Sequence, residues 1–377
     1  MAEISGVCDE KFAAVRQVLS DNIDSGADLG ASAAVFIDGE PVVDIWGGVA
    51  DGQTGAPWER NTLVNVWSTT KTMTALCALV LADAGEIDFN APVATYWPEF
   101  KAGGKDAVEV RHLMSHSAGL SGWAEPMAPE DLYDWDKATS LLAAQEPWWT
   151  PGTASGYHAV TQGYLVGEVV RRVSGQSLGQ FFATEIAGPL GADFHIGLPA
   201  SEDARIGRLV PPPPLSEQVA SLPEDSVARR TFINPVIDAT VTETREWRAA
   251  EIPAAGGQGN ARSVALAQSV LACSGTVAGR RFMSAAGADR VFEVQSDGDD
   301  LVLGVPIRFG MGYGLGNETM PLGARTCFWG GWGGSIIMVD LDLRMTVAYV
   351  MNRMESGLVG DQRGIGIVTA AFTSALG

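Results

Sequence analysis

Cysteine and histidine are scarce in this chain of 377 residues. Its four cysteines lie far apart and form no CxxC spacing, which disfavours a zinc site or a redox motif and favours reduced thiols: Cys8, Cys77, Cys273 and Cys327. The four histidines do not cluster with carboxylates. We therefore expect neither a metal site nor another cofactor.

Long apolar runs are also missing, and basic residues are outnumbered by acidic ones. No stretch reaches the roughly 18 uninterrupted apolar residues that span a bilayer, and the opening MAEISGVCDEKF has acidic residues where a secretory signal has basic ones. We expect a soluble, cytoplasmic protein that does not contact membranes. The net charge of −20, with 25 basic against 45 acidic residues, repels phosphate backbones, so nucleic acid is not an expected partner.

The first half of the chain passes from a β-rich start to a helical middle. Residues 32–48 contain two β-rich runs around an Asp-Gly pair, which is typical of a β-hairpin. A helix is predicted from Ser68 through Ala84, because a glycine follows it. Residues 86 to about 250 alternate helical segments with loops rich in Trp, Pro and Gly.

The last third returns to a mixed pattern. A helix is predicted near 262–273, strands at 334–342 and 345–352, and a final amphipathic helix from about 361. We therefore predict an α/β (α+β) fold. An antiparallel sheet built by both ends of the chain is flanked by helices, and a mainly helical second region accompanies it.

The predicted division into domains is discontinuous. Residues 1–90 and 255–377 form the sheet domain, and residues 91–254 form a helical domain with active-site loops. A site is expected in the cleft between them, where pockets commonly form. The proline run 211–214 and the polar residues after it are predicted to form an exposed loop over the site. The oligomeric state is not indicated.

A serine and a lysine share one face of the most apolar helix. Ser68 and Lys71 stand three residues apart in 66-VWSTTKTMTALCALVLADAGEIDF-89, and Lys71 is one of five lysines in the chain. The apolar residues after Lys71 predict a buried helix. Burial favours the neutral amine, which can accept a proton from a hydroxyl. Free N–H groups at the helix start favour negative charge nearby.

A second serine motif competes with this pair. The segment 175-GQSLG-179 fits the G-x-S-x-G pattern of a nucleophile elbow, which needs a strand before the serine and a histidine much later in the chain. An amphipathic helix precedes Ser177 instead, and His195 follows too soon. We interpret Ser177 as part of a link between two helices.

Two other segments can complete a site around Ser68. Tyr157 lies just before a helix, where a packing role is the simpler interpretation. Beside a serine and a lysine, however, its phenol can join a proton relay, since lysine and tyrosine have similar reference pKa values of about 10. The glycines of 327-CFWGGWGGS-335 either leave N–H groups free to face an oxyanion or form a strained turn before an edge strand.

Aromatic residues and histidines supply the remaining candidates. His116 is interpreted as holding its loop by hydrogen bonds, and so is His158, which can also contact a substrate. Five tryptophans would enclose a confined pocket for short or compact acyl groups if they converged, and packing is expected for all but the last two: Trp123, Trp148, Trp149, Trp329 and Trp332.

In this order and at these separations, the three segments resemble the serine β-lactamase and penicillin-binding-protein superfamily. Within it, the chain is most similar to the class C β-lactamase-like esterases of family VIII, and 112-HLMSHSAGL-120 and 186-IAGPLGADFHIGLP-199 extend the resemblance over nearly the whole chain. The resemblance implies a β-lactamase/transpeptidase-like fold. It also implies that Ser68 is the nucleophile, that Lys71 activates it, and that Tyr157 takes the place of the tyrosine in Y-x-N.

The resemblance also implies roles for the glycine-rich segment. Trp329, Gly330 and Gly331 take the place of K-T-G, and the N–H of Trp332 is implied to join that of Ser68 in an oxyanion hole. Trp329, Gly331 and Trp332 are therefore predicted to bind substrate.

Two departures from the superfamily pattern narrow the activity. Ala159 stands where β-lactamases have the asparagine of Y-x-N, and Trp329 stands where they have the lysine of K-T-G, with no lysine after Lys137. Recognition of the carboxylate of a penicillin or a peptidoglycan stem depends on a cation there, and an indole has no charge. The esterase branch carries W-x-G at this place, as this chain does.

The prediction that follows is a serine carboxylesterase. It hydrolyses small-molecule esters with short or compact acyl groups through an acyl-enzyme on Ser68, and either Lys71 or Tyr157 can be the immediate base. An acyltransferase, or an amide or β-lactam hydrolase, would use the same three residues and stays the alternative. A binding module without catalysis is the least favoured reading.

Overall fold

An antiparallel sheet of ten strands runs through the computed structural model, which describes residues 2–214 and 219–377. All of its pairings are antiparallel. In sheet order the strands are β1 (Ile4–Cys8), β3 (Glu40–Asp51), β2 (Gly30–Ile37), β14 (Met345–Met351), β13 (Ile336–Asp340), β12 (Thr326–Gly330), β11 (Gly314–Leu315), β10 (Pro306–Phe309) and β9 (Ser296–Asp299), with β4 (Ala56–Pro57) beside β3.

The two ends of the chain share this sheet, as predicted. The N-terminal strand β2 pairs with the C-terminal strand β14 over seven residues from each strand. The predicted hairpin is β2 and β3, whose turn residues Asp38 and Gly39 have φ angles of 54° and 81°. Two consecutive positive φ angles are what a tight hairpin turn requires, which explains the Asp-Gly pair.

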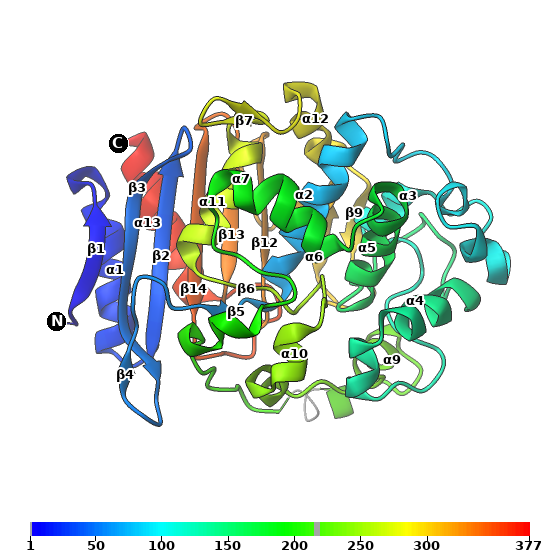
Figure 1. The fold of residues 1–377 in the computed structure, drawn as a ribbon, viewed down its shortest axis with the longest axis horizontal. Coiled ribbons are helices and arrows are strands. Elements are labelled where there is room, and N and C mark those ends of the chain that lie inside the picture. The colour runs from blue at the N-terminus through cyan, green and yellow to red at the C-terminus, as the bar shows by residue number, and fades with distance from the viewer. Residues whose placement is uncertain (1, 215–218) are drawn as a thin grey trace.

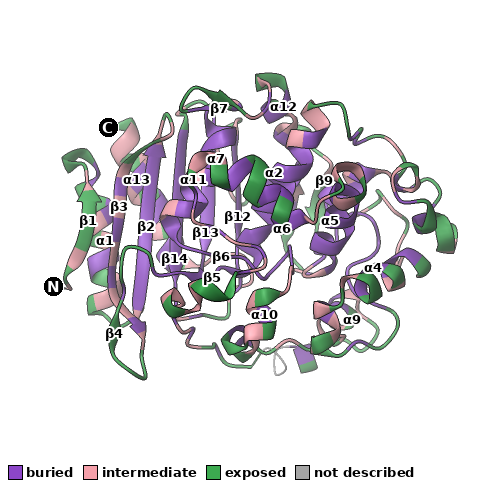
Figure 2. Ribbon diagram, in the orientation of Figure 1, coloured by how far each residue is buried: buried purple, intermediate pink, exposed green. Residues whose placement is uncertain are grey.

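Helices cover both faces of the sheet (Figure 1). α1 (Ala13–Asp24) and α13 (Gln362–Leu376) pack against each other on one face, and α11 (Ala261–Ala272) packs on β2 and β14 from the other. The predicted helices near 262–273 and from about 361 are therefore confirmed. Figure 2 shows the consequence for burial: the central strands are buried, whereas the edge strand β1 is largely exposed.

The helical region occupies the chain between two short paired strands, β5 (Val64–Asn65) and β6 (Gln258–Gly259), and fills the right side of Figure 1. No strand lies between them in the part of the chain that the structure describes. The helices here are α2 (Thr70–Asp83), α3 (Val110–Met114), α4 (Trp135–Ala144), α5 (Thr161–Ser174), α6 (Leu178–Phe181), α7 (Gly188–Leu190), α9 (Val227–Phe232) and α10 (Arg245–Ala249).

Shorter elements connect these parts. After α11 the chain forms β7 (Thr276–Val277), β8 (Arg280–Arg281) and α12 (Ala285–Asp289). The short helical turns are η1 (Glu10–Phe12), η2 (Trp67–Thr69), η3 (Val93–Thr95), η4 (Pro98–Gly104), η5 (Pro129–Tyr133), η6 (Phe182–Ala187), η7 (Ala200–Arg205), η8 (Ala239–Glu243) and η9 (Arg290–Phe292).

The predicted apolar helix is η2 followed by α2. Ser68 lies in the 3₁₀ turn rather than in the α-helix proper, and the helix ends at Ala84 before Gly85, which has a φ of 80°. Eleven of the fourteen residues of α2 are buried, because the sheet side and the helical region enclose it from both directions. α2 is therefore the element that both parts of the fold share.

The proline run has no regular structure, as predicted. Pro211, Pro212 and Pro214 border a small hollow beside Trp332. The polar residues predicted to continue this loop fall at 215–218, outside the described residues. The division into a sheet domain and a helical domain stays a prediction.

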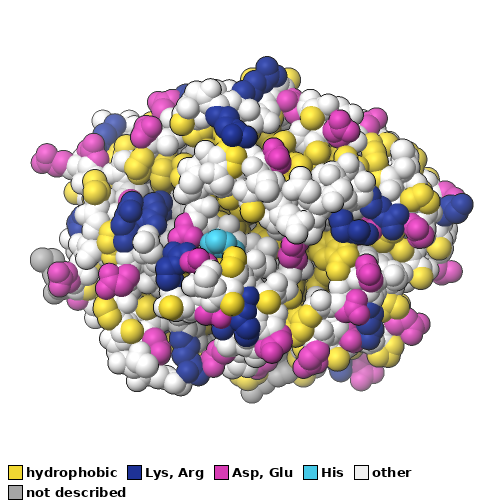
Figure 3. All heavy atoms as spheres, in the orientation of Figure 1, with side chains coloured by type: hydrophobic (Ala, Val, Ile, Leu, Met, Phe, Trp, Pro, Cys, Tyr) yellow, Lys and Arg dark blue, Asp and Glu magenta, His cyan; other side chains and the backbone are white. Residues whose placement is uncertain are grey.

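The surface reflects the acidic composition. On the face drawn in Figure 3, Asp and Glu side chains are scattered among fewer Lys and Arg side chains over both halves of the molecule. Among the described residues, no helix has both the length and the apolar character needed to cross a bilayer.

A buried ion pair joins the N-terminal and C-terminal parts of the chain to the loop after β12. The Arg363 guanidinium contacts Asp28 at 2.9 Å and Asp361 at 2.5 Å, and it donates to the carbonyl of Gly333 at 2.7 Å. Burial raises the pKa of Asp28 to about 6, although Arg363 and the Tyr349 hydroxyl both act to lower it. Asp28 therefore depends on these partners to stay ionised.

We expect Arg363→Ala to lower the free energy of unfolding by about 3–5 kcal/mol, because it leaves the buried Asp28 carboxylate without its ion pair. The matched control is Arg344→Ala, which removes a partly exposed pair with Asp38 and should cost less than about 1 kcal/mol. Urea unfolding followed by tryptophan fluorescence compares the two. Equal losses in both variants would contradict this account of the network.

Candidate active site

Ser68 and Lys71 meet at the start of α2. The Lys71 Nζ atom lies 3.0 Å from the Ser68 Oγ atom. Both side chains are buried, with 7% of Ser68 and 1% of Lys71 exposed. The two side chains, which the sequence predicts on one helix face, are therefore in contact. They share this face because η2 continues directly into α2.

The surroundings of Lys71 favour its neutral form. Its amine donates to the carbonyl oxygens of Ala159 at 2.6 Å and Ala254 at 3.0 Å, and no carboxylate pairs with it in the described residues. Burial lowers the pKa of Lys71 well below its ordinary value. A neutral amine has two N–H groups and one lone pair, so the two carbonyls use the N–H groups and the lone pair faces the Ser68 hydroxyl.

Tyr157 covers this pair from the helical region. The Lys71 Nζ atom lies 4.8 Å from the centre of the Tyr157 ring, and only 2% of Tyr157 is exposed. Burial raises the pKa of Tyr157, and the nearby Ser68 hydroxyl and Trp329 indole only partly oppose this. The phenol makes no hydrogen bond of good geometry to any described residue. Tyr157 therefore keeps its proton and has a donor available.

The two histidines hold the Tyr157 loop, as predicted. His116 accepts the N–H of His158 at 3.0 Å, and His158 accepts the N–H of Leu120 at 3.1 Å while its other ring nitrogen bonds the carbonyl of Gly156 at 2.6 Å. Burial lowers the pKa of His158 to about 3 and that of His116 well below its usual range. Both are neutral at working pH, and His158 has no ring nitrogen left for a substrate.

The residue before Ser68 has an unusual backbone. Trp67 has a φ of 49°, in the left-handed region that costs a non-glycine residue roughly 1–2 kcal/mol. Its indole ring contacts that of Trp332 at 4.8 Å and that of Trp247 at 5.6 Å between ring centres. These contacts hold a conformation that presents Ser68 at the sharp entry into α2. No residue type in this segment predicts the strain.

The glycine-rich loop after β12 approaches η2 very closely. A Cβ atom on Gly331 would lie 2.3 Å from the Val66 carbonyl oxygen and 3.2 Å from the Ser68 nitrogen, so only glycine fits. Ser335 fastens the contact, because its hydroxyl donates to Val66 at 2.8 Å and lies 2.9 Å from the Thr69 hydroxyl. Sequence reasoning did not single out Ser335.

Two backbone N–H groups near this contact have no acceptor within the described residues. Neither the N–H of Ser68 nor that of Trp332 donates to any part of the chain that the structure describes, whereas the N–H of Gly331 is used by Ser335 at 2.8 Å. Ser68 and Trp332 both line one pocket. Two unpaired backbone donors beside a serine hydroxyl are able to stabilise an oxyanion.

A further segment missed from the sequence is 253-PAAGG-257. It runs along the start of α2 and makes three hydrogen bonds with it: Lys71 to Ala254, Thr74 to Pro253 at 2.7 Å, and Gly257 to Thr70 at 2.9 Å. The segment acts mainly through its backbone, which explains why residue types alone do not reveal it.

The pocket at Ser68 is small and apolar, with a cavity volume of about 70 Å³. None of its lining side chains is charged. Its lining residues are Trp67, Ser68, Tyr157, Ala159, Val160, Thr231, Phe232, Pro235, Ile237, Ala255, Trp332 and Leu358.

The five candidate tryptophans do not converge on this pocket. Of the five, Trp332 alone lines it, beside Trp67, which the sequence did not indicate. Trp329 lies behind Tyr157 instead, with 5.4 Å between ring centres, and only 1% of it is exposed. Trp123 is held in the helical region by a 2.9 Å hydrogen bond to Ala138.

Comparison with known proteins decides the family. A family model described as Beta-lactamase matches residues 15–370. The chain belongs to the beta-lactamase family. The match spans every residue of the site around Ser68, and the expected β-lactamase/transpeptidase-like fold is confirmed.

Relatives within the beta-lactamase family agree over the whole length. The chain is 35% identical over 370 residues to the esterase/beta-lactamase LipL of Mycobacterium tuberculosis, covering 94% of this chain and 84% of that protein. It is 43% identical to the crystal structure of a family VIII carboxylesterase, with a TM-score of 0.92, 99% of this chain and 100% of that chain covered. A penicillin-binding protein homologue from Caulobacter crescentus is 38% identical, with a TM-score of 0.91 and the same coverage.

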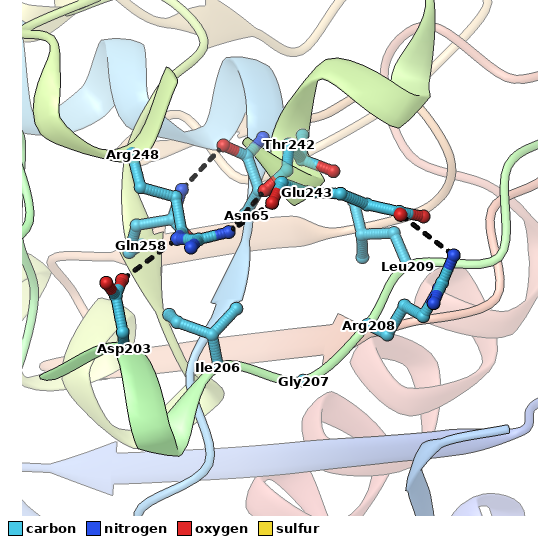
Figure 4. Close-up of a pocket in the computed structure, with 10 residues that line it drawn as sticks. All are labelled: Asn65, Asp203, Ile206, Gly207, Arg208, Leu209, Thr242, Glu243, Arg248 and Gln258. Atoms are coloured by element: carbon cyan, nitrogen blue, oxygen red, sulfur yellow. Dashed lines mark hydrogen bonds and ion pairs between the residues drawn. The ribbon is translucent and has the colours of Figure 1, made fainter. Parts of the chain in front are cut away.

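A second hollow in this beta-lactamase-family chain is polar (Figure 4). It has a volume of about 220 Å³ and lies beside β5 and β6. Two ion pairs line it, Arg208 with Glu243 at 2.8 Å and Arg248 with Asp203 at 3.0 Å. Its lining contains none of the predicted site residues, and its charged side chains already have partners.

The second serine motif has a structural role in this family member. Ser177 is the N-cap of α6 and accepts the N–H of Gln180 at 3.3 Å, while its hydroxyl donates to Glu251 at 2.5 Å. It follows α5 rather than a strand. Ser177 therefore links two helices, as interpreted from the sequence.

We expect Ser177→Ala to lower the free energy of unfolding by about 1 kcal/mol, because it removes the helix cap. Ser201→Ala, which removes an exposed hydroxyl bonded only to Glu202, should change stability by less than about 0.5 kcal/mol. Urea unfolding measures both values. A Ser177 variant as stable as the wild type would show that the cap contributes nothing.

Proposed function

We propose that this protein is a serine carboxylesterase with Ser68 as nucleophile, Lys71 as base and Tyr157 as proton donor. The observation that carries the proposal is the buried Lys71 amine, which lies 3.0 Å from the Ser68 hydroxyl and directs its two N–H groups to carbonyl oxygens. The esterase names of its relatives LipL and the family VIII carboxylesterase support the reaction class.

The first half of the reaction forms an acyl-enzyme. Lys71 takes the proton of Ser68 as Oγ bonds to the ester carbonyl carbon, and the carbonyl oxygen gains the negative charge. The N–H groups of Ser68 and Trp332 stabilise this oxyanion. The C–O bond to the alcohol then breaks, and the departing oxygen takes the proton of Tyr157. The proton held by Lys71 restores the Tyr157 phenol.

The second half releases the acid. Neutral Lys71 takes a proton from a water molecule, whose oxygen bonds to the acyl carbonyl carbon. When the tetrahedral intermediate collapses, the bond to Ser68 breaks, Oγ takes the proton from Lys71, and Lys71 is again neutral. The opposite pKa shifts of the two side chains support the division of roles, because burial favours a neutral Lys71 that accepts a proton and a protonated Tyr157 that donates one.

The proposed substrates are neutral esters with short or compact acyl groups. The pocket is narrow and its lining has no cation to pair with a carboxylate. Trp329, which stands where a lysine would bind the carboxylate of a β-lactam, supports Tyr157 from behind, and Gly331 allows the oxyanion loop to approach. Hydrolysis of β-lactams by the same residues is therefore disfavoured.

The two-domain division belongs to the same proposal. Ser68, Lys71 and Trp332 come from the segments 1–90 and 255–377, whereas Tyr157 comes from 91–254. The lining of the pocket, which draws on both, supports a site in the cleft between them.

We expect Ser68→Ala to lower kcat for p-nitrophenyl acetate, butyrate and octanoate by at least about 10⁴-fold, because the nucleophile is lost. Ser177→Ala should keep wild-type rates for all three esters. Spectrophotometric assays of purified variants measure this. Retained hydrolysis in the Ser68 variant, with loss in the Ser177 variant, would reverse the assignment.

We expect kcat/KM to fall as the pH is lowered through the pKa of Lys71, because the protonated amine has no lone pair for the serine proton. Lys71→Arg should be inactive at every pH, since a guanidinium stays charged. The control is Lys105→Met, which removes another buried lysine bonded to backbone carbonyls and should leave the acid limb in place. The variant Lys71→Met removes the amine altogether. If its kcat/KM still falls over the same range as the pH is lowered, the base is a residue other than Lys71.

A further inference from the structure

A buried carboxylate grips the backbone of Tyr157 from another part of the chain. The Oδ1 atom of Asp300 accepts the N–H groups of Tyr157, Val302 and Leu303, each at 2.9 Å. Only 1% of Asp300 is exposed. Asp300 directly follows strand β9, at the end of the segment 297-DGDD-300.

The turn that carries Asp300 is closed on itself and fastened to the Tyr157 loop. The Asp300 N–H donates to Val305 at 3.0 Å, and its carbonyl accepts the N–H of Gly304 at 2.9 Å. The N–H of Leu301 donates to Ser155 at 2.9 Å, two residues before Tyr157. The sheet edge formed by β9 and β10 therefore holds the loop of the helical region at two points.

We propose that Asp300 is a positioning residue, which holds Tyr157 over Ser68 by binding the Tyr157 backbone to the turn between β9 and β10. This inference rests on the proposed function of Tyr157 as proton donor. Asp300 does not line the pocket at Ser68, so it acts on the substrate through Tyr157 only.

Packing around the phenol comes from the same strands. Tyr157 belongs to a small cluster, separate from the main core, with Val302 and Ile307 from the hairpin and with Phe309 and Trp329. Trp329 and Phe309 lie 5.3 Å apart between ring centres. The hairpin thus fixes both the backbone and the ring of Tyr157, and a displacement of about 1 Å in a reacting group can cost roughly 10²-fold in rate.

The negative charge of Asp300 also supports the proposed role of Tyr157, because burial and this charge both raise the pKa of the phenol. The titratable groups that face Tyr157 are Lys71 from α2, the neutral His116 and His158, and Asp300 from the hairpin. The Asp300 carboxylate adds to the burial that raises the pKa of Tyr157. A protonated phenol is the form that can protonate a departing alcohol.

The test uses two butyrate esters whose alcohols differ in their need for a proton. p-Nitrophenolate departs without one, whereas the ethoxide of ethyl butyrate requires one. The measured quantity is the ratio of kcat/KM for p-nitrophenyl butyrate to kcat/KM for ethyl butyrate. We expect Asp300→Ala to raise this ratio by about 10–100-fold, because general acid catalysis contributes at least about 10²-fold. Tyr157→Phe should raise it by a similar factor. The ratio does not depend on how much of the protein is folded.

Two variants control for a purely structural effect. The first is Asn317→Ala. The Asn317 side chain accepts the N–H of Met320 at 2.8 Å, which caps a neighbouring turn, and it donates to the Pro306 carbonyl in β10. Its removal should leave the ratio unchanged. Asp300→Asn keeps an oxygen for the three N–H groups and should stay within about threefold of the wild-type ratio. An unchanged ratio in Asp300→Ala, or one shifted equally by Asn317→Ala, would overturn the proposal.

A double-mutant cycle separates this inference from the proposed function. If Asp300 acts through Tyr157, adding Asp300→Ala to Tyr157→Phe should change the ratio by less than about twofold. Additive effects would show that Asp300 acts by another route. Failure of the proposed function would appear differently, as ester hydrolysis that persists in Ser68→Ala.

Discussion

The site depends on one interaction, a lysine amine that is buried against a serine hydroxyl without a counter-ion. Water would keep Lys71 charged, and a carboxylate neighbour would do the same. The fold instead offers two carbonyl oxygens, from Ala159 and Ala254, that satisfy both N–H groups of a neutral amine and direct the third position to Ser68. Removing either carbonyl from its place would free the amine to turn away.

Each partner of the amine comes from a different part of the fold. The turn η2 supplies Ser68 and α2 supplies Lys71, while the loop before α5 supplies Ala159 and the segment before β6 supplies Ala254. The glycine loop after β12 completes the set, because it places Trp332 in the lining of the pocket that Ser68 also lines. Because α2 lies between the sheet and the helical region, it is the one element on which all these segments can meet.

The same arrangement explains the selectivity that we propose. Where a cation would bind a carboxylate, the chain has Trp329, which packs behind Tyr157 rather than facing the pocket. The space beside Ser68 is therefore left apolar and uncharged, and a developing charge meets neutral donors there, among them the backbone N–H groups and the Tyr157 phenol. These donors stabilise the negative charge that develops on the carbonyl oxygen during the reaction. A neutral ester carries no other charge that the pocket would have to bind.

The sequence by itself determined the features that arise from neighbours along the chain. The Ser68 and Lys71 pair and the hairpin around β2 and β3 follow from spacing and from the geometry of particular residue types. Tertiary structure alone decided the strained Trp67 and the roles of Ser335 and Asp300. Each of these contacts joins residues that are far apart in the chain, and the groups that the Ser335 and Asp300 side chains bind belong to the backbone, which every residue type carries alike. A pattern of residue types along the chain therefore does not predict them.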